Sequence, residues 1–218
     1  MLRSVSIVPS ILTNDKQDFR NQIESINRFA RRAQIDVTDG QFAEKTTIDI
    51  TNIWWPKTWE ADVHLMFLNP SEYMDIIIKL HPSLCILHAE AGEDLLPSFD
   101  RLKEAGIKTG VALLKQTYPP KIKAYIDAVD HVLIFAGELG QQGGKADMMQ
   151  MEKIPLIRNM KPEVEIGWDG GVNFTNMRAL AHADLDVINV GSTISKAEDP
   201  MTTFNNLIAE IDKNGVVL

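Results

Sequence analysis

Short apolar runs alternate with longer segments of helical spacing along the whole chain. The apolar runs predict strands at 5–9, 34–38, 61–66, 84–88, 108–114, 131–136, 164–168 and 187–190. Helices are predicted between them, at 15–32, 48–55, 69–80, 94–104, 119–126, 148–160, 173–181, 193–196 and 199–213. Strict alternation indicates a parallel sheet, and eight strand–helix units favour its closure into a (β/α)8 TIM barrel, an α/β fold.

The second predicted strand carries polar residues where an apolar face is expected. In this strand Ile35 and Val37 fall on one face, and Gln34 and Asp36 fall on the other. A lone carboxylate is costly to bury, so a strand in the middle of a domain carries one only with a partner. The pattern therefore predicts that Asp36 binds a cation or takes part in chemistry.

Two more polar residues follow predicted strands of the same barrel. His64 and Asp169 come at the C-terminal ends of the third and seventh strands, where TIM barrels keep their active sites. Two carboxylates across a barrel mouth suit removal of a proton from one face of a carbon and its return to the other. A histidine between them suits a metal ligand. Each residue alone also fits a structural role, as a turn former or a hydrogen-bonded histidine.

Glycine-rich segments follow the last strands and point to a phosphate. Gly170-Gly171 follows the seventh strand, and Gly191-Ser192 follows the eighth. Loops at these places often form the phosphate site of this fold, through backbone N–H groups at a helix start. The glycine-rich loop 137–144 follows the sixth strand and would close over the same group. For each glycine pair alone, a tight turn is the alternative.

Length and charge restrict the class of protein. The chain has 218 residues, which fits one barrel domain over 1–218. It has 30 acidic and 22 basic residues and no basic run, which argues against nucleic acid as a partner. The single cysteine, Cys85, excludes an internal disulfide. No stretch is apolar enough for a signal peptide or a membrane span, so we expect a cytoplasmic protein.

Three tryptophans, Trp54, Trp55 and Trp59, cluster before the third strand. Packing against the outer wall of the barrel is the expected use of these side chains. A contact between subunits of a homo-oligomer is the alternative.

Several motifs resemble the ribulose-phosphate 3-epimerase family in order and spacing. They are Ser6-Ile-Val-Pro-Ser10, Asp36-Val-Thr-Asp39-Gly40-Gln-Phe42, Asp62-Val-His64-Leu-Met66, His88-Ala-Glu-Ala91, Asp169-Gly-Gly-Val-Asn173 and Gly191-Ser192. The resemblance implies a barrel of the ribulose-phosphate-binding type. It also implies an epimerase that interconverts D-ribulose 5-phosphate and D-xylulose 5-phosphate at C3 by two-aspartate proton transfer, through an enediolate stabilised by a divalent metal ion.

The resemblance also implies roles for single residues. Asp36 and Asp169 would be the acid and base and, with His64, metal ligands; Gln34 stands where the family has a fourth ligand, a histidine. Ser10 would contact substrate hydroxyls, and Met66 would line the pocket. The phosphate would lie against Gly140, Gly143, Gly144, Gly170, Gly171, Gly191 and Ser192.

Departures from the family pattern leave alternatives open. A carboxamide at Gln34 is a weaker donor than imidazole, so Zn, Mn, Fe and Mg are all candidate metals. Thr38, Gln41 and Glu138 also differ from the family. The substrate would be ribulose 5-phosphate or a ketohexose 6-phosphate. The alternatives are a non-catalytic relative that binds a sugar phosphate or a partner protein, and a metal-assisted decarboxylase, for which the expected Lys is absent from 60–64.

Overall fold

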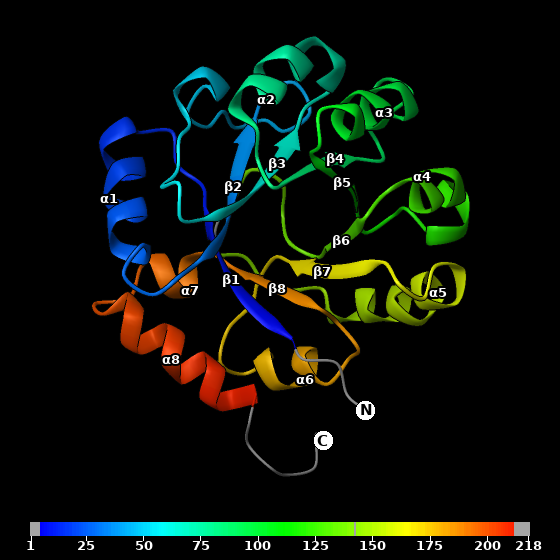
Figure 1. Cartoon of the computed structure of the whole chain (residues 1–218). Coiled ribbons are helices and arrows are strands. Elements are labelled where there is room, and N and C mark those ends of the chain that lie inside the picture. Colours follow the sequence, from blue (N-terminus) through cyan, green and yellow to red (C-terminus); the bar gives the residue numbers. More distant parts are fainter. Residues whose placement is uncertain (1–4, 142, 212–218) are drawn as a thin grey trace.

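The protein is a closed parallel barrel surrounded by helices (Figure 1). The structure, a computed structural model, describes residues 5–141 and 143–211. The strands follow one another around the barrel in chain order, so the predicted (β/α)8 TIM barrel is confirmed. They are β1 (Ser6–Ile11), β2 (Arg32–Thr38), β3 (Glu60–Met66), β4 (Leu84–His88), β5 (Lys108–Leu113), β6 (His131–Phe135), β7 (Glu165–Asp169) and β8 (Val187–Val190).

Helices cover the outside of the barrel, and α8 packs beside α1 and α6 (Figure 1). The α-helices are α1 (Lys16–Ile26), α2 (Met74–Leu80), α3 (Leu96–Glu104), α4 (Lys123–Ala128), α5 (Lys153–Met160), α6 (Met177–Ala181), α7 (Ser192–Ser195) and α8 (Pro200–Ile211). Short 3₁₀ segments are η1 (Ile50–Asn52), η2 (Pro70–Tyr73), η3 (Pro119–Ile122) and η4 (Met148–Glu152). The last predicted residues, 212 and 213, lie outside the described residues.

The first predicted helix was too long at its C-terminal end. α1 stops at Ile26, and Arg32, its predicted last residue, instead opens β2. Arg32 pairs in register with Glu60 of β3. This residue therefore belongs to the sheet, although its helical spacing predicted a place in the helix. Two other predicted helices begin with 3₁₀ turns at Pro70 and Pro119 before α-helix follows. Proline suits the start of such a segment because it has no N–H to donate.

The sixth helix was also predicted to start too early. Asn173 was expected as its cap, but α6 begins at Met177. The Asn173 carboxamide oxygen accepts the backbone N–H and the hydroxyl of Thr175. These bonds hold a turn before the helix.

Inside the barrel, an apolar layer separates the two ends. Leu84, Ile86, Ala112 and Leu133 form a small buried cluster distinct from the large core between strands and helices. Gly110 leaves room for it, because a Cβ there would lie 2.9 Å from a side-chain carbon of Ile86. The interior is therefore filled, as is usual in this fold. We call the C-terminal ends of the strands the mouth, and the N-terminal ends the base.

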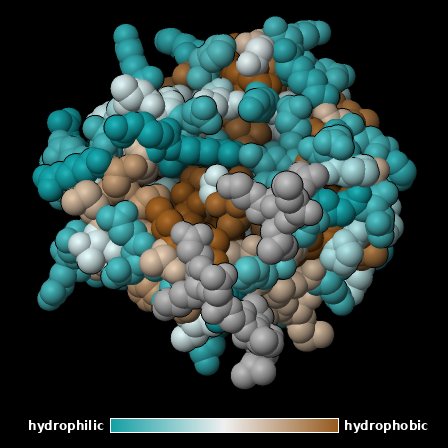
Figure 2. All heavy atoms as spheres, turned by 60° about the horizontal axis from the view of Figure 1, so that its bottom comes forward, coloured by the Kyte–Doolittle hydropathy of each residue, from teal (hydrophilic) through white to brown (hydrophobic). Residues whose placement is uncertain are grey.

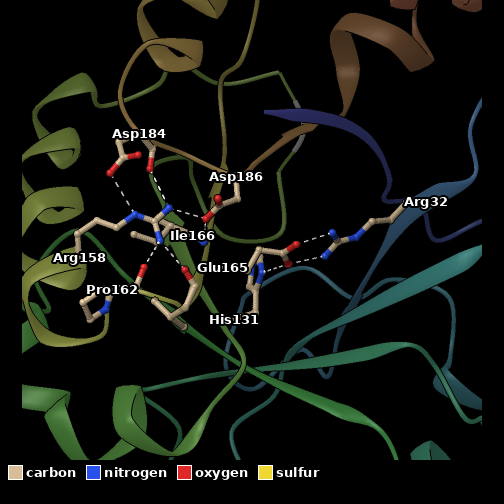
Figure 3. Close-up of polar contacts among 9 residues, drawn as sticks. Arg32, His131, Arg158, Pro162, Glu165, Ile166, Asp184 and Asp186 are labelled. Carbon is tan, nitrogen blue, oxygen red and sulfur yellow. Dashed lines mark hydrogen bonds and ion pairs between the residues drawn. The ribbon is translucent and has the colours of Figure 1, made fainter. Parts of the chain in front are cut away.

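The base holds a partly buried ionic network. Arg32 donates to Asp62 at 2.8 Å and to both carboxylate oxygens of Glu165 at 2.8 and 2.7 Å. Nδ1 of His131 lies 2.7 Å from Glu165, so that carboxylate stands between Arg32 and His131 (Figure 3). Burial raises the pKa of Asp62 to about 6 although Arg32 opposes it. Burial would raise the pKa of Glu165 too, but hydrogen bonds from Arg32 and His131 hold it well below its usual range.

The tryptophan prediction is supported in part. Trp59 is buried, and its indole N–H donates to Asn27 at 2.8 Å. Trp54 is 40% exposed and packs edge-on against Phe19. Core packing therefore accounts for Trp59, while a subunit contact through Trp54 stays a prediction.

The surface is largely polar on the face turned forward in Figure 2, with hydrophobic residues gathered near its middle. In the described part of the chain, the helices are too short or too polar to cross a membrane. The cytoplasmic location stays a prediction.

Candidate active site at the barrel mouth

The mouth contains a hollow that is open to solvent. Asp36 and Asp169 lie on its wall. Every residue predicted to bind substrate also lines it: Ser10, Met66, Gly140, Gly143, Gly144, Gly170, Gly171, Gly191 and Ser192. The fold thus brings these residues together from strands and loops far apart in sequence. Their roles as ligands stay predictions.

The two carboxylates and a histidine form a tight cluster at the floor of the hollow. Nδ1 of His64 lies 2.9 Å from Oδ1 of Asp36 and 3.9 Å from Oδ2 of Asp169. Candidate ligand atoms of the three residues all lie within 4.8 Å of one another, and all three side chains are buried. The register of the sheet explains this meeting, since Asp36 pairs with His64 across β2 and β3.

Gln34 completes the cluster from below. Its Nε2 donates to Asp36 at 2.8 Å and to Asp169 at 2.6 Å, and the side chain is fully buried. Its Oε1 has no hydrogen-bond partner. Gln34 therefore points at both carboxylates, as its predicted place in the ligand set requires. In this rotamer it presents N–H groups, however, and an amide nitrogen that donates cannot bind a cation.

Burial, with the like charge of Asp36, raises the pKa of Asp169 to about 7. Burial is the main cause and Asp36 adds to it, while His64 and the hydrogen bond from Gln34 oppose it. Near neutral pH one of the pair therefore readily holds a proton. In the described residues no Lys or Arg forms an ion pair with either carboxylate.

Sequence reasoning assigned no role to two residues next to His64, namely His88 and Glu90. Nε2 of His64 lies 2.9 Å from Nε2 of His88, and Nδ1 of His88 lies 3.4 Å from Glu90. Burial lowers the pKa of His88 to about 4, so its ring is neutral. The two Nε2 atoms are close enough for one ring to donate to the other, and the tautomers decide which ring is the donor.

In the tautomer in which His64 carries its hydrogen on Nε2, a lone pair on Nδ1 faces Asp36. A lone pair and a carboxylate oxygen 2.9 Å apart repel unless a proton or a cation lies between them. The cluster of Asp36, His64 and Asp169 thus fits a divalent cation in donor type, burial and spacing. Gln34 could join only through Oε1, after its amide turns over.

Glycines let the loops of the mouth pack closely. A Cβ on Gly170 would lie 2.2 Å from the backbone nitrogen of Gly137, and one on Gly171 would lie 2.0 Å from that of Ala146. The loop after β7 therefore lies against the loop after β6. Gly143 approaches Ser192 at the start of α7, with its would-be Cβ 3.5 Å from the Ser192 hydroxyl. Three loops thus converge over one side of the hollow.

Comparison with known proteins agrees with this arrangement. The model of the family described as "Ribulose-phosphate 3 epimerase family" matches residues 6–195.

The chain belongs to the ribulose-phosphate 3-epimerase family.

Relatives and solved structures support this membership. The chain is 30% identical over 204 residues to a ribulose-phosphate 3-epimerase of Bacillus subtilis (strain 168), covering 89% of this chain and 94% of the relative. It is 30% identical over 202 residues to one of Helicobacter pylori (strain ATCC 700392 / 26695), covering 89% and 93%. A crystal structure of 3-hexulose-6-phosphate synthase superposes with a TM-score of 0.74 at 15% identity, covering 95% of this chain and 100% of that one, which shows the fold alone.

Within this family member, Asp39 has a structural use. Its Oδ1 accepts the backbone N–H groups of Gln41 and Phe42, both at 2.8 Å, and its Oδ2 accepts that of Leu68 at 2.7 Å. Asp39 thereby ties the loop after β2 to the end of β3. It is a carboxylate of the same motif as Asp36, but its hydrogen-bonding capacity is already used.

The acidic residue in the loop after β6 is also paired. Glu138 accepts from Nζ of Lys115 at 2.6 Å, which fastens the loop to the end of β5. The expected acid near the phosphate is thus partly neutralised.

Outside the loop 137–144, sequence reasoning gave no role to four residues that line the hollow, Leu12, Phe135, Val172 and Asn189. Phe135 ends β6 and lies near the rings of His64 and His88. Asn189 is the one polar residue in the apolar strand Val187–Val190, and this was the signal that could have found it.

Proposed function

We propose that the chain is a ribulose-phosphate 3-epimerase that inverts C3 of a phosphorylated ketose, with D-ribulose 5-phosphate and D-xylulose 5-phosphate as the pair. One observation carries the proposal. Asp36 and Asp169 are buried together beside a hollow, without a Lys or Arg partner among the described residues, and the pKa of Asp169 is raised to about 7. Such a pair is poised to accept one proton and donate another. The names of the relatives support the same activity.

The substrate would lie along one side of the hollow. Its phosphate would sit where the loops after β6, β7 and β8 converge, held by backbone N–H groups of the glycines and Ser192. The carbon chain would then reach down to the acids. Ser10, 6% exposed and close to Gln34 in register, would donate to a substrate hydroxyl. Met66 and Phe135 would exclude water from the carbon chain.

The two acids would act on opposite faces of C3. In one direction Asp36 takes the C3 proton, the C3–H electron pair forms the C2–C3 double bond, and the π pair of the C2 carbonyl moves to its oxygen to give an enediolate. Asp169, whose pKa burial raises to about 7, then gives a proton to C3 from the other side. In the reverse direction the two exchange roles.

Gln34 and His64 would hold these acids in place. Gln34 donates to both carboxylates, so it fixes their spacing. Asp36, His64 and Asp169 would hold a divalent cation, drawn from Zn, Mn, Fe or Mg. When bound, such a cation supplies positive charge to the ketose oxygens, where negative charge develops during proton removal.

The non-catalytic alternative also rests on a specific observation. The N–H groups of Gln34 already bridge the carboxylates, which is how a protein would stabilise them without a cation or a reaction. In that case the chain would bind a sugar phosphate and would not remove a proton from any carbon atom of the sugar.

Exchange with solvent separates these proposals. The protein is incubated with D-ribulose 5-phosphate in heavy water, with each of the four metals, and the sugars are analysed by mass spectrometry and NMR. Epimerisation predicts deuterium at C3 and the appearance of D-xylulose 5-phosphate. Absence of deuterium from C3 with every metal, in protein that binds the sugar phosphate, would favour the non-catalytic binder. A reaction without protein serves as the control.

A further inference from the structure

Asn189 has two buried polar groups that the protein leaves unused. The side chain lines the hollow and is 2% exposed, yet neither its Nδ2 nor its Oδ1 has a hydrogen-bond partner. Leaving a buried amide unpaired is costly, and an apolar side chain of the same shape would avoid the cost. A buried, unpaired amide that lines a candidate active site is therefore a candidate ligand-binding group.

The register of the sheet fixes where that ligand would lie. Asn189 is the partner of Asp169 on β7 and of Val8 on β1, so its side chain points into the barrel beside the catalytic candidate. Two residues further along the chain, Gly191 begins the segment that lines the upper hollow with Ser192. Asn189 thus stands between the acids and the predicted phosphate site.

The free atoms define the chemistry of the missing partner. Nδ2 can only donate, and Oδ1 can only accept. A hydroxyl group satisfies both kinds of atom, because its oxygen accepts and its hydrogen donates. A carbonyl or a phosphate oxygen would satisfy Nδ2 alone.

We propose that Asn189 binds the substrate hydroxyl carried by the carbon between the reacting carbon and the phosphate-bearing carbon. This inference rests on the proposed function, since it takes the acids and the phosphate cradle as the two ends of the substrate. In a pentulose 5-phosphate that group is the C4 hydroxyl. Asn189 therefore makes the site select sugars with a hydroxyl there, because a deoxy analogue leaves the buried amide unpaired.

Binding of unreactive analogues tests the inference without need of turnover. D-ribitol 5-phosphate and its 4-deoxy counterpart are titrated calorimetrically into the wild type, Asn189→Leu and a control, Val187→Ala. Val187 lies on the same strand, is buried, and carries no polar group. We expect the wild type and the control to bind the 4-deoxy compound about tenfold more weakly, as the loss of a hydrogen bond to a buried group predicts. Asn189→Leu should bind the two compounds about equally.

Thermal unfolding distinguishes this binding role from a structural one. Asn189→Leu should unfold at the same temperature as the wild type or higher, since it removes two unpaired groups. Val187→Ala should unfold at a lower temperature, because it leaves a cavity.

Three results would overturn the inference. The wild type could bind the two compounds equally, Asn189→Leu could still bind the 4-deoxy compound about tenfold more weakly, or the wild type could bind neither compound. Failure of the proposed function gives a different result, namely the full discrimination pattern in binding but no deuterium at C3 of D-ribulose 5-phosphate.

Discussion

Each end of the barrel interior contains two acids and a histidine. The acids at the base have an arginine partner, whereas those at the mouth have none in the described residues. At the base, Asp62 and Glu165 share the guanidinium of Arg32. At the mouth, Asp36 and Asp169 share only the neutral amide of Gln34. Each end also has a buried histidine within hydrogen-bonding distance of a carboxylate. The apolar layer around Ile86 lies between them.

The difference shows how a structural cluster and a functional one can be told apart. At the base both acids of the network have a positive partner, so their charges are balanced without a ligand. At the mouth the charge balance is left open, and a proton or a cation must complete it. The open cluster is also the one that borders a hollow. An uncompensated acid pair beside a cavity is therefore a stronger sign of chemistry than the residue types alone.

The largest expected effect comes from removing either acid at the mouth. Asp36→Asn and Asp169→Asn each leave a group that cannot cycle a proton, so kcat should fall by at least about 10²–10⁴. The free energy of unfolding should stay the same or rise, because each variant removes one of two like charges. Epimerase assays and urea unfolding measure the two quantities. Near-full activity in either variant would contradict the two-acid mechanism.

The matching change at the base should act on stability instead. Arg32→Leu leaves two acids without their cation, and we expect a loss of about 2–3 kcal/mol at pH 8, less than for full burial because Arg32 is partly exposed. Activity per folded molecule should be kept. Urea unfolding of both proteins measures the loss, and Arg31→Leu, at an exposed neighbour, is the control. An equal loss of unfolding free energy in Arg31→Leu would show that the effect does not come from the ionic network at the base.

The pH dependence of that loss follows from the two acids of the network. The folded pKa of Asp62 is raised to about 6, so burial of its charge destabilises the fold above that pH and is relieved by protonation below it. The folded pKa of Glu165 is lowered, so its contribution is full above its ordinary pKa of 4.5 and is lost as pH falls below that value. The destabilisation by Arg32→Leu should therefore shrink as pH falls from 8 to about 5, since a neutral Asp62 no longer needs a cation.

A smaller effect, on zinc affinity, is expected at Gln34, where the mouth departs from the family pattern. Gln34→His replaces a bridging amide by an imidazole, a good ligand for zinc, and we expect zinc affinity to rise by about tenfold or more. Competition with a chromophoric chelator measures this without an activity assay. Gln34→Leu, which offers no donor atom, is the matched control. Equal zinc affinity in the wild type and Gln34→His would mean that residue 34 takes no part in the ligand set.

The smallest effect belongs to the ion pair on the rim of the mouth. Glu138 is largely exposed, so its bond to Lys115 should contribute little. Lys115→Ala should change the free energy of unfolding by less than about 0.5 kcal/mol. A loss comparable with that of Arg32→Leu would show that the loop after β6 supports the whole fold.

Much of the candidate site could be predicted from local patterns. Asp169 is the last residue of β7, and Asp36 and His64 lie two residues before the ends of β2 and β3. The barrel brings these strand ends to one mouth. The overlong first helix shows the limit of this reasoning. Its helical spacing extended to Arg32, but pairing with β3 and the ion pairs at the base placed that residue in a strand.

The sequence by itself determined the alternation of strands and helices, hence the barrel, and which residues lie near the C-terminal end of each strand. These features depend on periodicity between neighbours along the chain. Only the tertiary structure decided that Gln34 bridges two acids, that Gly170 packs on the backbone of Gly137, and that Asn189 stands unpaired beside Asp169. Those facts depend on the register between strands and on distances across the barrel, which unite residues more than a hundred positions apart and leave no local pattern.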